Sequence, residues 1–528
     1  MSVRDVTTPR ADAVPPAAPD AAAAPDAVPH RRELGLRSER GPVLLAVMLA
    51  TGLVALDSTV IATAVPSVVS DLGGFSQFPW LFSIYLLTQA VSVPIYGKLS
   101  DTLGRRPVML VGIGLFLLGS VLCGVAWSMP ALIAFRALQG LGAGAVQPIS
   151  MTVLGDLYTV AERAKVQGYV ASVWGASSVL GPAIGGVFSD YLSWRWIFFV
   201  NLPLGAYAVW VFVRRFREVE RPPTRHRIDY LGAGVLAVAT SSLVVAMLEG
   251  GTAWGWGSPV SVALFAVAGV GLVVFGLVER RASEPVLPLW TLRHRILIGG
   301  NLSAFGVGAL LIGLSSYVPT LAQGVLGTGA VVAGFALAAL TLGWPVAASN
   351  SGRIYMRVGF RDTCLLGSVA VIGGSVWLAL LPESTTVFEL AAACFVVGIG
   401  MGLVASPAIV AVQSVVGWDR RGVVTGTSMF FRSMGSAVGA AAFGLIANHV
   451  LTDRFAHPPA AVAGRLPDSA DATSIVLGGS HRGGDAVAAY VRDGLYDATH
   501  GVFVTLLVVA VLTAAAVAVM PRRARELD

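Results

Sequence analysis

Charged residues are scarce in this chain. Asp, Glu, Lys and Arg together make up 12% of its 528 residues. An ordinary soluble domain carries about twice that share of charge, so this class of protein is excluded. The formal net charge of +6 is interpreted as a signal of membrane topology and not as the basic surface of a nucleic-acid-binding protein. We therefore expect no nucleic-acid partner.

Cysteine and histidine are also rare, with 3 and 7 residues respectively. Cys123, Cys364 and Cys394 all lie in apolar stretches, which is typical of small buried side chains and not of disulfides. The histidines fall in tails, loops and helix ends, where they cannot form a zinc-type cluster within a membrane. We expect no metal centre and no cofactor.

Apolar residues, in contrast, make up 55% of the chain, and its mean hydropathy is +0.74. A helix that crosses a bilayer needs about 20 predominantly apolar residues. The sequence contains fourteen such stretches and therefore predicts an all-α polytopic membrane protein with fourteen transmembrane helices. The stretches cover residues 43–66, 79–97, 108–127, 130–153, 166–189, 197–213, 230–248, 260–278, 298–322, 330–351, 364–381, 387–412, 423–447 and 499–520.

The basic residues indicate the orientation of these helices, because short cytoplasmic loops retain Lys and Arg. One set of connections carries nearly all of the basic side chains, and Arg195 is the exception among the short loops of the other set. An even number of helices places both termini on one side, and we expect that side to be the cytoplasm beneath a plasma membrane. The preference for arginine over lysine favours a GC-rich bacterial source.

Glycines recur along the chain at a constant spacing. Gly140, Gly142 and Gly144 are repeated as a second triple 258 residues later, and GKLSDTLGRR from Gly97 is repeated as GRIYMRVGFR 255 residues later. A parallel repeat of this kind is typical of transporters. We expect two six-helix bundles related by a pseudo-two-fold axis, plus two inserted helices. The predicted segments are a disordered cytoplasmic tail 1–40, an N-terminal bundle 41–218, an inserted pair 219–285, a C-terminal bundle 286–520 with a loosely ordered outer loop 449–498, and a cytoplasmic C-terminus 521–528.

A single carboxylate lies deep in the first apolar stretch. If this helix enters the bilayer near Val43, Asp57 lies roughly 21 Å along it at ~1.5 Å per residue, which is past the midpoint of a hydrocarbon core about 30 Å thick. An ionised carboxylate is costly there, so we predict that Asp57 binds the coupling proton. Arg136 lies about 9 Å below the outer boundary, at the same depth, and we predict that the two pair. Capping or snorkelling side chains are the alternative interpretation.

The stretch GKLSDTLGRRP, residues 97–107, falls in the predicted loop between the second and third helices. Gly97 and Gly104 allow close backbone approach, and Asp101 beside Arg105 and Arg106 is able to bind a helix N-terminus or to exchange ion-pair partners between two conformations. A simple basic turn is the alternative. The stretch resembles the best-known signature of the major facilitator superfamily, and this resemblance implies that Asp101 is a gate latch.

The resemblance extends to other stretches. RALQGLGAGAVQP, which begins at Arg136, is similar to the second signature of the superfamily. WGASSVLGPAIGG looks like the antiporter signature of its exporters, although small residues also serve ordinary helix packing. With LDSTVIATAVP, WRWIFFVNLPLG and the helix count, these motifs make the chain similar to the fourteen-helix drug:proton antiporter family over residues 43–520. The residues that carry the antiporter signature are Gly175, Gly181, Pro182, Gly185 and Gly186.

In the second copy of the gate motif, Met356 stands where Asp101 would map, so we do not expect a symmetric latch. Arg432 lies about 15 Å along the thirteenth helix, near the midplane. No second carboxylate is equally deep, so we expect Arg432 to contact substrate. Further side chains suit a mixed polar and aromatic pocket, although each also suits plain packing: Tyr85, Gln89, Gln147, Trp174, Tyr317, Gln323 and Trp344.

These features predict a monomeric, proton-coupled antiporter that exports amphipathic small molecules, such as drugs or antibiotics, by alternating access. Neutral or anionic amphiphiles are favoured over dications, because Asp57 is the only deep carboxylate. Export of one dedicated endogenous metabolite, antibiotic or lipid is the nearest alternative. A sodium ion would prefer several oxygen ligands to one carboxylate. An intramembrane enzyme would need a nucleophile and a base, or metal ligands, at one depth, and a sensor would need a signalling module in its loops. Neither is visible in the sequence.

Overall fold

The computed structural model describes residues 35–36, 38–73, 77, 80–216, 218, 229–250, 254–459, 462 and 485–522. Within these ranges the chain is helical, apart from an isolated bridge between Gly250 and Trp254 and the short connections. Most of the predicted tail 1–40 lies outside the described residues, as do residues 219–228 and 523–528.

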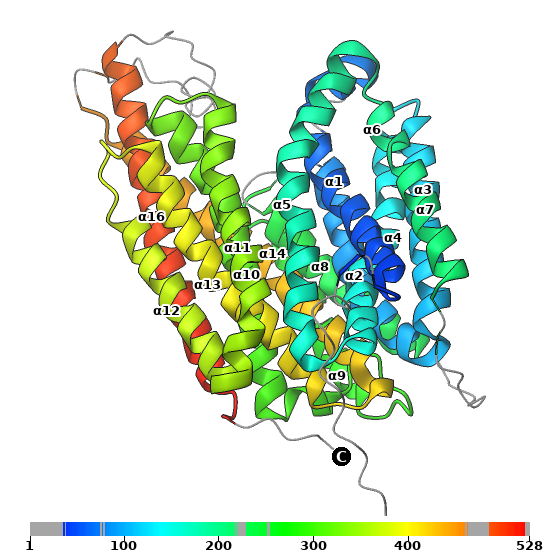
Figure 1. The fold of residues 1–528 in the computed structure, drawn as a ribbon. Helices are drawn as coiled ribbons and strands as arrows, with labels where there is room; N and C mark the ends of the chain where they lie inside the picture. The colour runs from blue at the N-terminus through cyan, green and yellow to red at the C-terminus, as the bar shows by residue number, and fades with distance from the viewer. Residues whose placement is uncertain are drawn as a thin grey trace, which may run out of the picture.

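Two helical bundles stand side by side (Figure 1). The first contains α1 (Gly41–Leu72), α2 (Trp80–Leu103), α3 (Arg105–Gly124), α4 (Met129–Leu157), α5 (Val160–Tyr191), α6 (Trp196–Phe199) and α7 (Asn201–Arg214). The second contains α10 (Arg295–Thr320), the π-helical turn η3 (Leu321–Val325), α11 (Ala330–Val358), α12 (Phe360–Ala379), α13 (Val387–Ser414), the short η4 (Trp418–Arg420), α14 (Arg421–Ala456) and α16 (Asp485–Ala518). Between them in sequence lie α8 (Tyr230–Glu249), α9 (Pro259–Glu279) and η2 (Leu289–Leu292).

The two bundles repeat the same arrangement. Helices α3 and α12 both have 20 residues and begin 255 residues apart, whereas α4 and α13 begin 258 residues apart. These are the offsets of the glycine repeats. Helix α2 packs on α4 as α11 packs on α13, and α1 packs on α5 as α10 packs on α14. The predicted fold class, an all-α polytopic protein built from a repeat, is confirmed.

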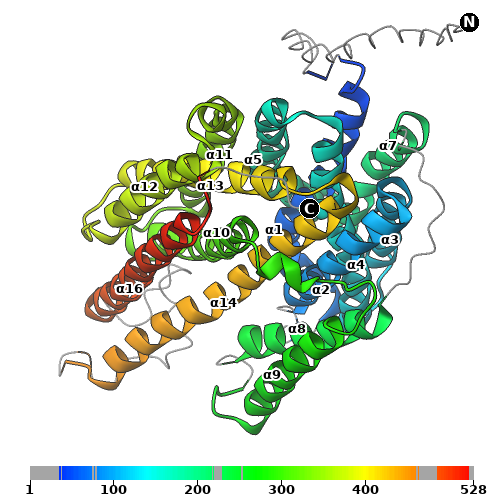
Figure 2. The same ribbon diagram turned by 90° about the horizontal axis from the view of Figure 1, so that it is seen from below.

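The bundles meet along two seams, one between α2 and α14 and the other between α5 and α11 (Figure 2). The inserted pair α8 and α9 packs against the edge of the first seam, where Leu236 and Phe275 join a buried cluster with Val91 and Met434. The opposite side of α9 exposes valines, including Val270, which suits contact with lipid. The pair therefore lies outside both bundles.

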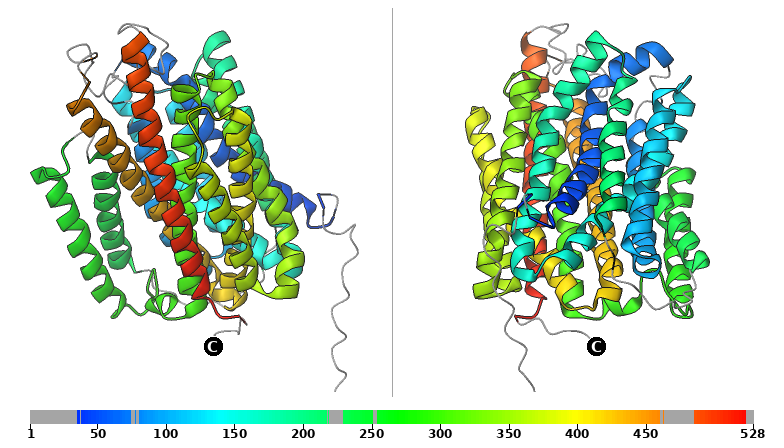
Figure 3. Two further views of the ribbon diagram at one scale, coloured as in Figure 1. Left: turned by 90° about the vertical axis from the view of Figure 1, so that its left-hand side faces the viewer. Right: turned by 45° about the vertical axis from the view of Figure 1, so that its right-hand side comes forward.

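Among the described residues, 13 helices are long and apolar enough to cross a membrane. Helix α5 is not one of these by composition, although its 32 residues span about 48 Å at ~1.5 Å per residue. Its many glycine and serine residues lower its hydropathy. They suit its position between α1 and α11, where close contact between helices replaces contact with lipid. Counted by length, α5 is the fourteenth spanning helix, and Figure 3 shows the helices crossing the molecule from end to end.

Two sequence predictions about loops were wrong. The gate motif does not form a loop, because α2 continues to Leu103 and Gly104 alone separates it from α3. The outer segment 449–498 is helical at both ends, since α14 continues to Ala456 and α16 starts at Asp485. Polar side chains suggested loops at both places, but they bind neighbouring helices: Arg454 of α14 pairs with Asp493 of α16. Residues 460–461 and 463–484 lie outside the described residues.

Candidate functional site

The deep carboxylate of α1 contacts the deep guanidinium of α4. Asp57 Oδ2 lies 2.5 Å from Arg136 Nη1, and the two residues are 2% and 1% exposed. Their pairing agrees with the depths calculated from the sequence. Removing one partner of such a buried pair leaves an uncompensated charge, which typically costs about 3–5 kcal/mol. Loss of either partner would therefore disturb the packing of α1 against α4.

Three more polar side chains surround Asp57. Gln139 Nε2 donates to Asp57 Oδ1 and to Ser120 Oγ, each at 2.8 Å, and Asn201 Nδ2 lies 3.5 Å from the same carboxylate oxygen. Gln139, Asn201 and Ser120 are all buried. The sequence prediction missed these residues. Gln139 had a readable signal, because it lies three residues after Arg136 and thus on the same side of the helix, whereas Ser120 had none.

Tyr85 belongs to this charge site and not to an open pocket. The Arg136 guanidinium lies 4.2 Å from the centre of the Tyr85 ring, and its Nε donates to the Leu81 carbonyl at 3.1 Å. A cation over an aromatic face gains electrostatic stabilisation, more so where water is excluded. The ring also covers the guanidinium, and Tyr85 itself is 1% exposed. The arrangement is able to hold one titratable carboxylate away from bulk water.

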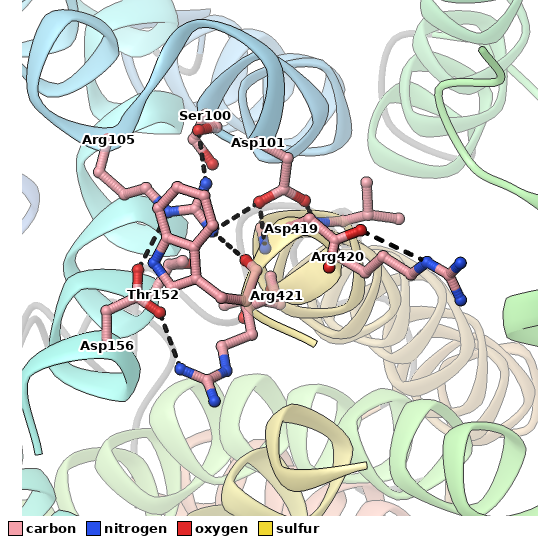
Figure 4. Close-up of polar contacts among 12 residues, drawn as sticks. Ser100, Asp101, Arg105, Thr152, Asp156, Asp419, Arg420 and Arg421 are labelled. Carbon is pink, nitrogen blue, oxygen red and sulfur yellow. Dashed lines mark hydrogen bonds and ion pairs between the residues drawn. The ribbon is translucent and has the colours of Figure 1, made fainter. Parts of the chain in front are cut away.

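A second polar cluster closes the molecule at the end where the basic loops lie, which we call the basic end (Figure 4). Asp101 Oδ1 accepts from Gly422 N at 2.9 Å and Asp101 Oδ2 from Val423 N at 2.7 Å. These N–H groups lie in the first turn of α14, where helices leave donors without partners and carry partial positive charge. Arg420, the N-cap residue of α14, makes no side-chain cap of its own. A carboxylate from the first bundle thus caps a helix of the second.

Arg105 connects this cap to both bundles. Its Nη2 lies 2.8 Å from Asp101 Oδ1 and donates to the Trp418 carbonyl at 2.6 Å, while its Nε lies 3.1 Å from Asp156 Oδ2. Arg421 Nη1 reaches the other oxygen of Asp156 at 3.0 Å. The sequence prediction named Arg105 but missed Asp156, Trp418 and Arg421. They come from distant parts of the sequence and meet only because the bundles close together.

The remaining residues of the gate motif act at short range. A Cβ added at Gly97 would lie 2.7 Å from the Gly422 carbonyl oxygen, so glycine permits the contact between α2 and α14. Gly104 has a φ of 102°, which L side chains rarely adopt. Arg106 donates to the Val213 carbonyl at 2.6 Å and so contacts its own bundle.

The second copy of the motif makes a different contact. Met356 is 60% exposed, and the neighbouring Tyr355 donates its hydroxyl hydrogen to the Val160 carbonyl. Helix α5, the counterpart of α14, is capped within its own bundle by Thr159 and Glu162. The carboxylate cap from the opposite bundle is therefore asymmetric, as the sequence predicts.

The glycines of the antiporter signature have unequal surroundings on α5. A Cβ at Gly181 would lie 2.1 Å from Thr59 Oγ1 of α1, and one at Gly175 would lie 3.2 Å from the Thr341 carbonyl oxygen of α11. Gly185 is buried, whereas a Cβ at Gly186 would meet nothing within 4 Å. The side chain of Pro182 lies outside the described residues, although α5 runs through this position without a break. Close packing thus involves Gly175 and Gly181 in particular.

Two of the predicted pocket residues meet between the bundles, where Arg432 Nη2 of α14 donates to Gln147 Oε1 of α4 at 2.9 Å. The other pocket residues do not converge on this contact. Trp174 is 36% exposed and Gln89 is half-buried. Tyr317 and Trp344 pack against the core of the second bundle, and Gln323 lies in the turn η3.

At the opposite end, the first bundle is tied to itself. Asp71 of α1 accepts hydrogen bonds from Arg195 Nη1 at 2.6 Å and from Trp194 Nε1 at 3.1 Å, and these bonds lower the pKa of the Asp71 carboxyl. In contrast, the hydrogen bonds described above that join one bundle to the other are found from the basic end up to mid-depth. The structure is therefore a conformation closed at its basic end.

Two repeated membrane bundles, with a buried ion pair inside one bundle and a polar seal across one end of the seam, are the architecture of a membrane transporter. The chain belongs to the major facilitator superfamily, whose sequence profile matches residues 47–440. It is 36% identical over 424 residues to the multidrug transporter protein MdtP of Bacillus subtilis strain 168, covering 80% of this chain and 78% of that protein. It is 32% identical over 484 residues to multidrug resistance protein 3 of the same strain, covering 90% and 94%.

The fold is also similar to a solved structure. The human organic anion transporter MFSD10 (TETRAN) matches with a TM-score of 0.58 over 89% of this chain and 99% of that one, at 15% sequence identity. At this low identity the likeness concerns the fold alone. It agrees with the two-bundle architecture of the present chain.

Proposed function

We propose that this protein is an antiporter that uses inward proton flow to export amphipathic small molecules across a bacterial plasma membrane, with both termini in the cytoplasm. The observation that supports this best is the buried pair of Asp57 and Arg136. The two Bacillus subtilis relatives are named for multidrug transport or resistance, which supports drug-like compounds as the substrates.

The coupling follows from the energetics of the buried pair. While Asp57 is ionised, its charge is balanced by Arg136 and by the donors of Gln139 and Asn201. Protonation removes that charge and leaves the guanidinium without its counter-ion, so α1 and α4 favour a different arrangement. Proton binding and substrate binding then favour different conformations, which is what antiport requires.

The test is transport in proteoliposomes with an imposed pH gradient. Asp57→Asn should abolish uphill efflux, because no group in the site then titrates, while exchange of substrate for substrate across the membrane continues. Asp71→Asn is the matched control, since this carboxylate is on the same helix but its side chain is 48% exposed. It should transport like the wild type.

Folding must be measured beside transport, because an uncompensated Arg136 destabilises the bundle. Asp57→Glu keeps a carboxyl group and should retain part of the uphill transport. Undiminished uphill efflux by a folded Asp57→Asn protein would remove Asp57 from the mechanism. If the wild type transports one compound and none of a panel of unrelated amphiphiles, the protein is a dedicated exporter of that compound.

A further inference from the structure

The contact between Arg432 and Gln147 lies at mid-depth on the seam between the bundles. Arg432 is eleven residues after Arg421, the first residue of α14, and Gln147 is ten residues before Leu157, the last of α4. At ~1.5 Å per residue, both lie about 15–17 Å from the basic end. Each side chain therefore reaches the same level from its own bundle.

In the part of the chain that the structure describes, no acidic side chain balances the charge of Arg432. A guanidinium carries five N–H donors, and the partner that the structure shows, Gln147 Oε1, is neutral. Among the described residues, no carboxylate forms an ion pair or hydrogen bond with Arg432. Arg432 is half-buried on the seam, and an unbalanced cation that is partly withdrawn from water attracts an anion that enters the same space.

The acidic side chains of the helices are held elsewhere. Asp57 is enclosed within the first bundle and is 2% exposed, so a molecule between the bundles cannot reach its charge. Asp101 and Asp156 belong to the seal at the basic end. At the level of Arg432, the charge that faces the seam in the described part of the chain is therefore positive.

The backbone at Arg432 is fixed in a way that directs the side chain to the seam. A Cβ added at Gly308 of α10 would lie 2.0 Å from the Arg432 carbonyl oxygen, and Ser436 Oγ donates to the Gly308 carbonyl at 3.0 Å. Helix α14 is thus packed directly against α10 on one side. On another side, the guanidinium extends across the seam to α4.

We infer that Arg432 is the substrate-selecting residue, and that it binds the carboxylate of amphipathic organic anions. This inference rests on the proposed export function. In the structure, the neutral Gln147 Oε1 accepts a hydrogen bond from the guanidinium. A substrate carboxylate replaces it and gains charge-assisted, two-point hydrogen bonds that an amide cannot match. Cationic amphiphiles meet like charge at this position and are carried less well.

The experiment compares two dyes that share one aromatic scaffold and differ in charge: carboxyfluorescein, an anion, and rhodamine 123, a cation. Uptake into inside-out proteoliposomes is driven by a pH gradient, in zwitterionic lipid so that anionic headgroups do not occupy Arg432. Arg432→Gln should lower the kcat/KM for the anion by about tenfold or more, as loss of a charge-assisted hydrogen bond implies. Transport of the cation should stay unchanged or rise.

Two further variants make the test independent of any folding defect in Arg432→Gln. Gln147→Glu places a carboxylate beside Arg432 and should suppress anion transport while the protein keeps its thermal stability, because the guanidinium is then paired internally. Arg432→Lys keeps the charge without the planar donor pair and should retain part of the anion transport. Arg353→Gln is the control, since Arg353 is an exposed arginine at the basic end of α11. It should not change the ratio between the dyes.

The outcomes separate this inference from the proposed function. Equal loss of both dyes in Arg432→Gln and no selective loss in Gln147→Glu would show a structural role and overturn the inference. A wild type that carries the cation in response to the gradient, and ignores the anion, also overturns it while proton-coupled export stands. A wild type that moves the anion without using the gradient leaves the selectivity intact and refutes the coupling.

Discussion

Replacing Asp101 by asparagine should weaken the seal at the basic end. The substitution removes the charge that balances the N-terminus of α14 and leaves one amide oxygen as an acceptor for Gly422 N and Val423 N. A hydrogen bond to a charged group contributes about 1.5–3 kcal/mol, against about 1 kcal/mol for a neutral one. Arg105 also loses its ion-pair partner in α2. We expect a net loss of about 2 kcal/mol from the closed state, which is roughly a 30-fold change in the open-to-closed ratio.

Distances between spin labels measure this ratio directly. Leu103 at the end of α2 and Met356 near the end of α11 are 58% and 60% exposed, and they belong to opposite bundles. The three native cysteines are buried, which limits labelling at unwanted positions. In Asp101→Asn, a population with a longer distance should grow at the expense of the closed one.

Asp419→Asn is the matched control for this experiment. Asp419 lies in the same seam, just before α14, but its side chain is 71% exposed and its ion pair with Arg420 is long at 3.7 Å. Exposed pairs contribute about 0–1 kcal/mol, so the distance distribution should stay near that of the wild type. An unchanged distribution in Asp101→Asn, or the same shift in both variants, would refute the reasoning.

Glycine substitutions give further predictions. Gly97→Ala should favour opening of the basic end, because its Cβ would lie 2.7 Å from the Gly422 carbonyl oxygen, and a larger long-distance population between spin labels at positions 103 and 356 would report it. Gly308→Ala should instead lower the thermal stability in detergent, by about 1–3 kcal/mol as overpacking does, since its Cβ would lie 2.0 Å from a carbonyl oxygen within the same bundle. Gly114→Ala, whose Cβ would meet nothing within 4 Å, should leave the melting temperature unchanged, and a drop as large as that of Gly308→Ala would contradict the packing argument.

Depth along the helices was readable from the sequence because the rise per residue in an α-helix is fixed. Hydropathy gave the entry points of the first and fourth helices, and counting residues then placed Asp57 and Arg136 at one level. The same reasoning put Arg432 near the midplane. The repeat was readable as well, since small residues are required wherever two helices touch closely. The depth of a residue depends on one helix alone, and the repeat depends on the comparison of two stretches of sequence, so neither requires knowledge of how the helices are packed.

The sequence did not predict the direction in which each side chain points or which side chains from different helices meet. Asn201 of α7 reaches Asp57, Ser120 of α3 accepts a hydrogen bond from Gln139, and Asp156 meets Arg421 across the seam. Such meetings depend on helix tilt, rotation and the closure of two bundles, which one sequence does not determine. Helix ends were misjudged for a related reason: Asp101 is polar, but it is buried against α14 and so continues α2 beyond the apolar stretch.

Helix α4 carries one residue of each of the three polar sites. Arg136 pairs with the deep carboxylate, Gln147 meets Arg432 on the seam, and Asp156 joins the seal at the basic end. At about 100° per residue, the eleven residues from Arg136 to Gln147 return to nearly the same side of the helix, whereas Asp156 projects from the opposite side. A rotation or tilt of α4 that relaxes the buried pair therefore moves the other two contacts together. In the proposed antiport mechanism, α4 would be the two-state element that couples the proton to the substrate, because Arg136 and Gln147 belong to the same helix.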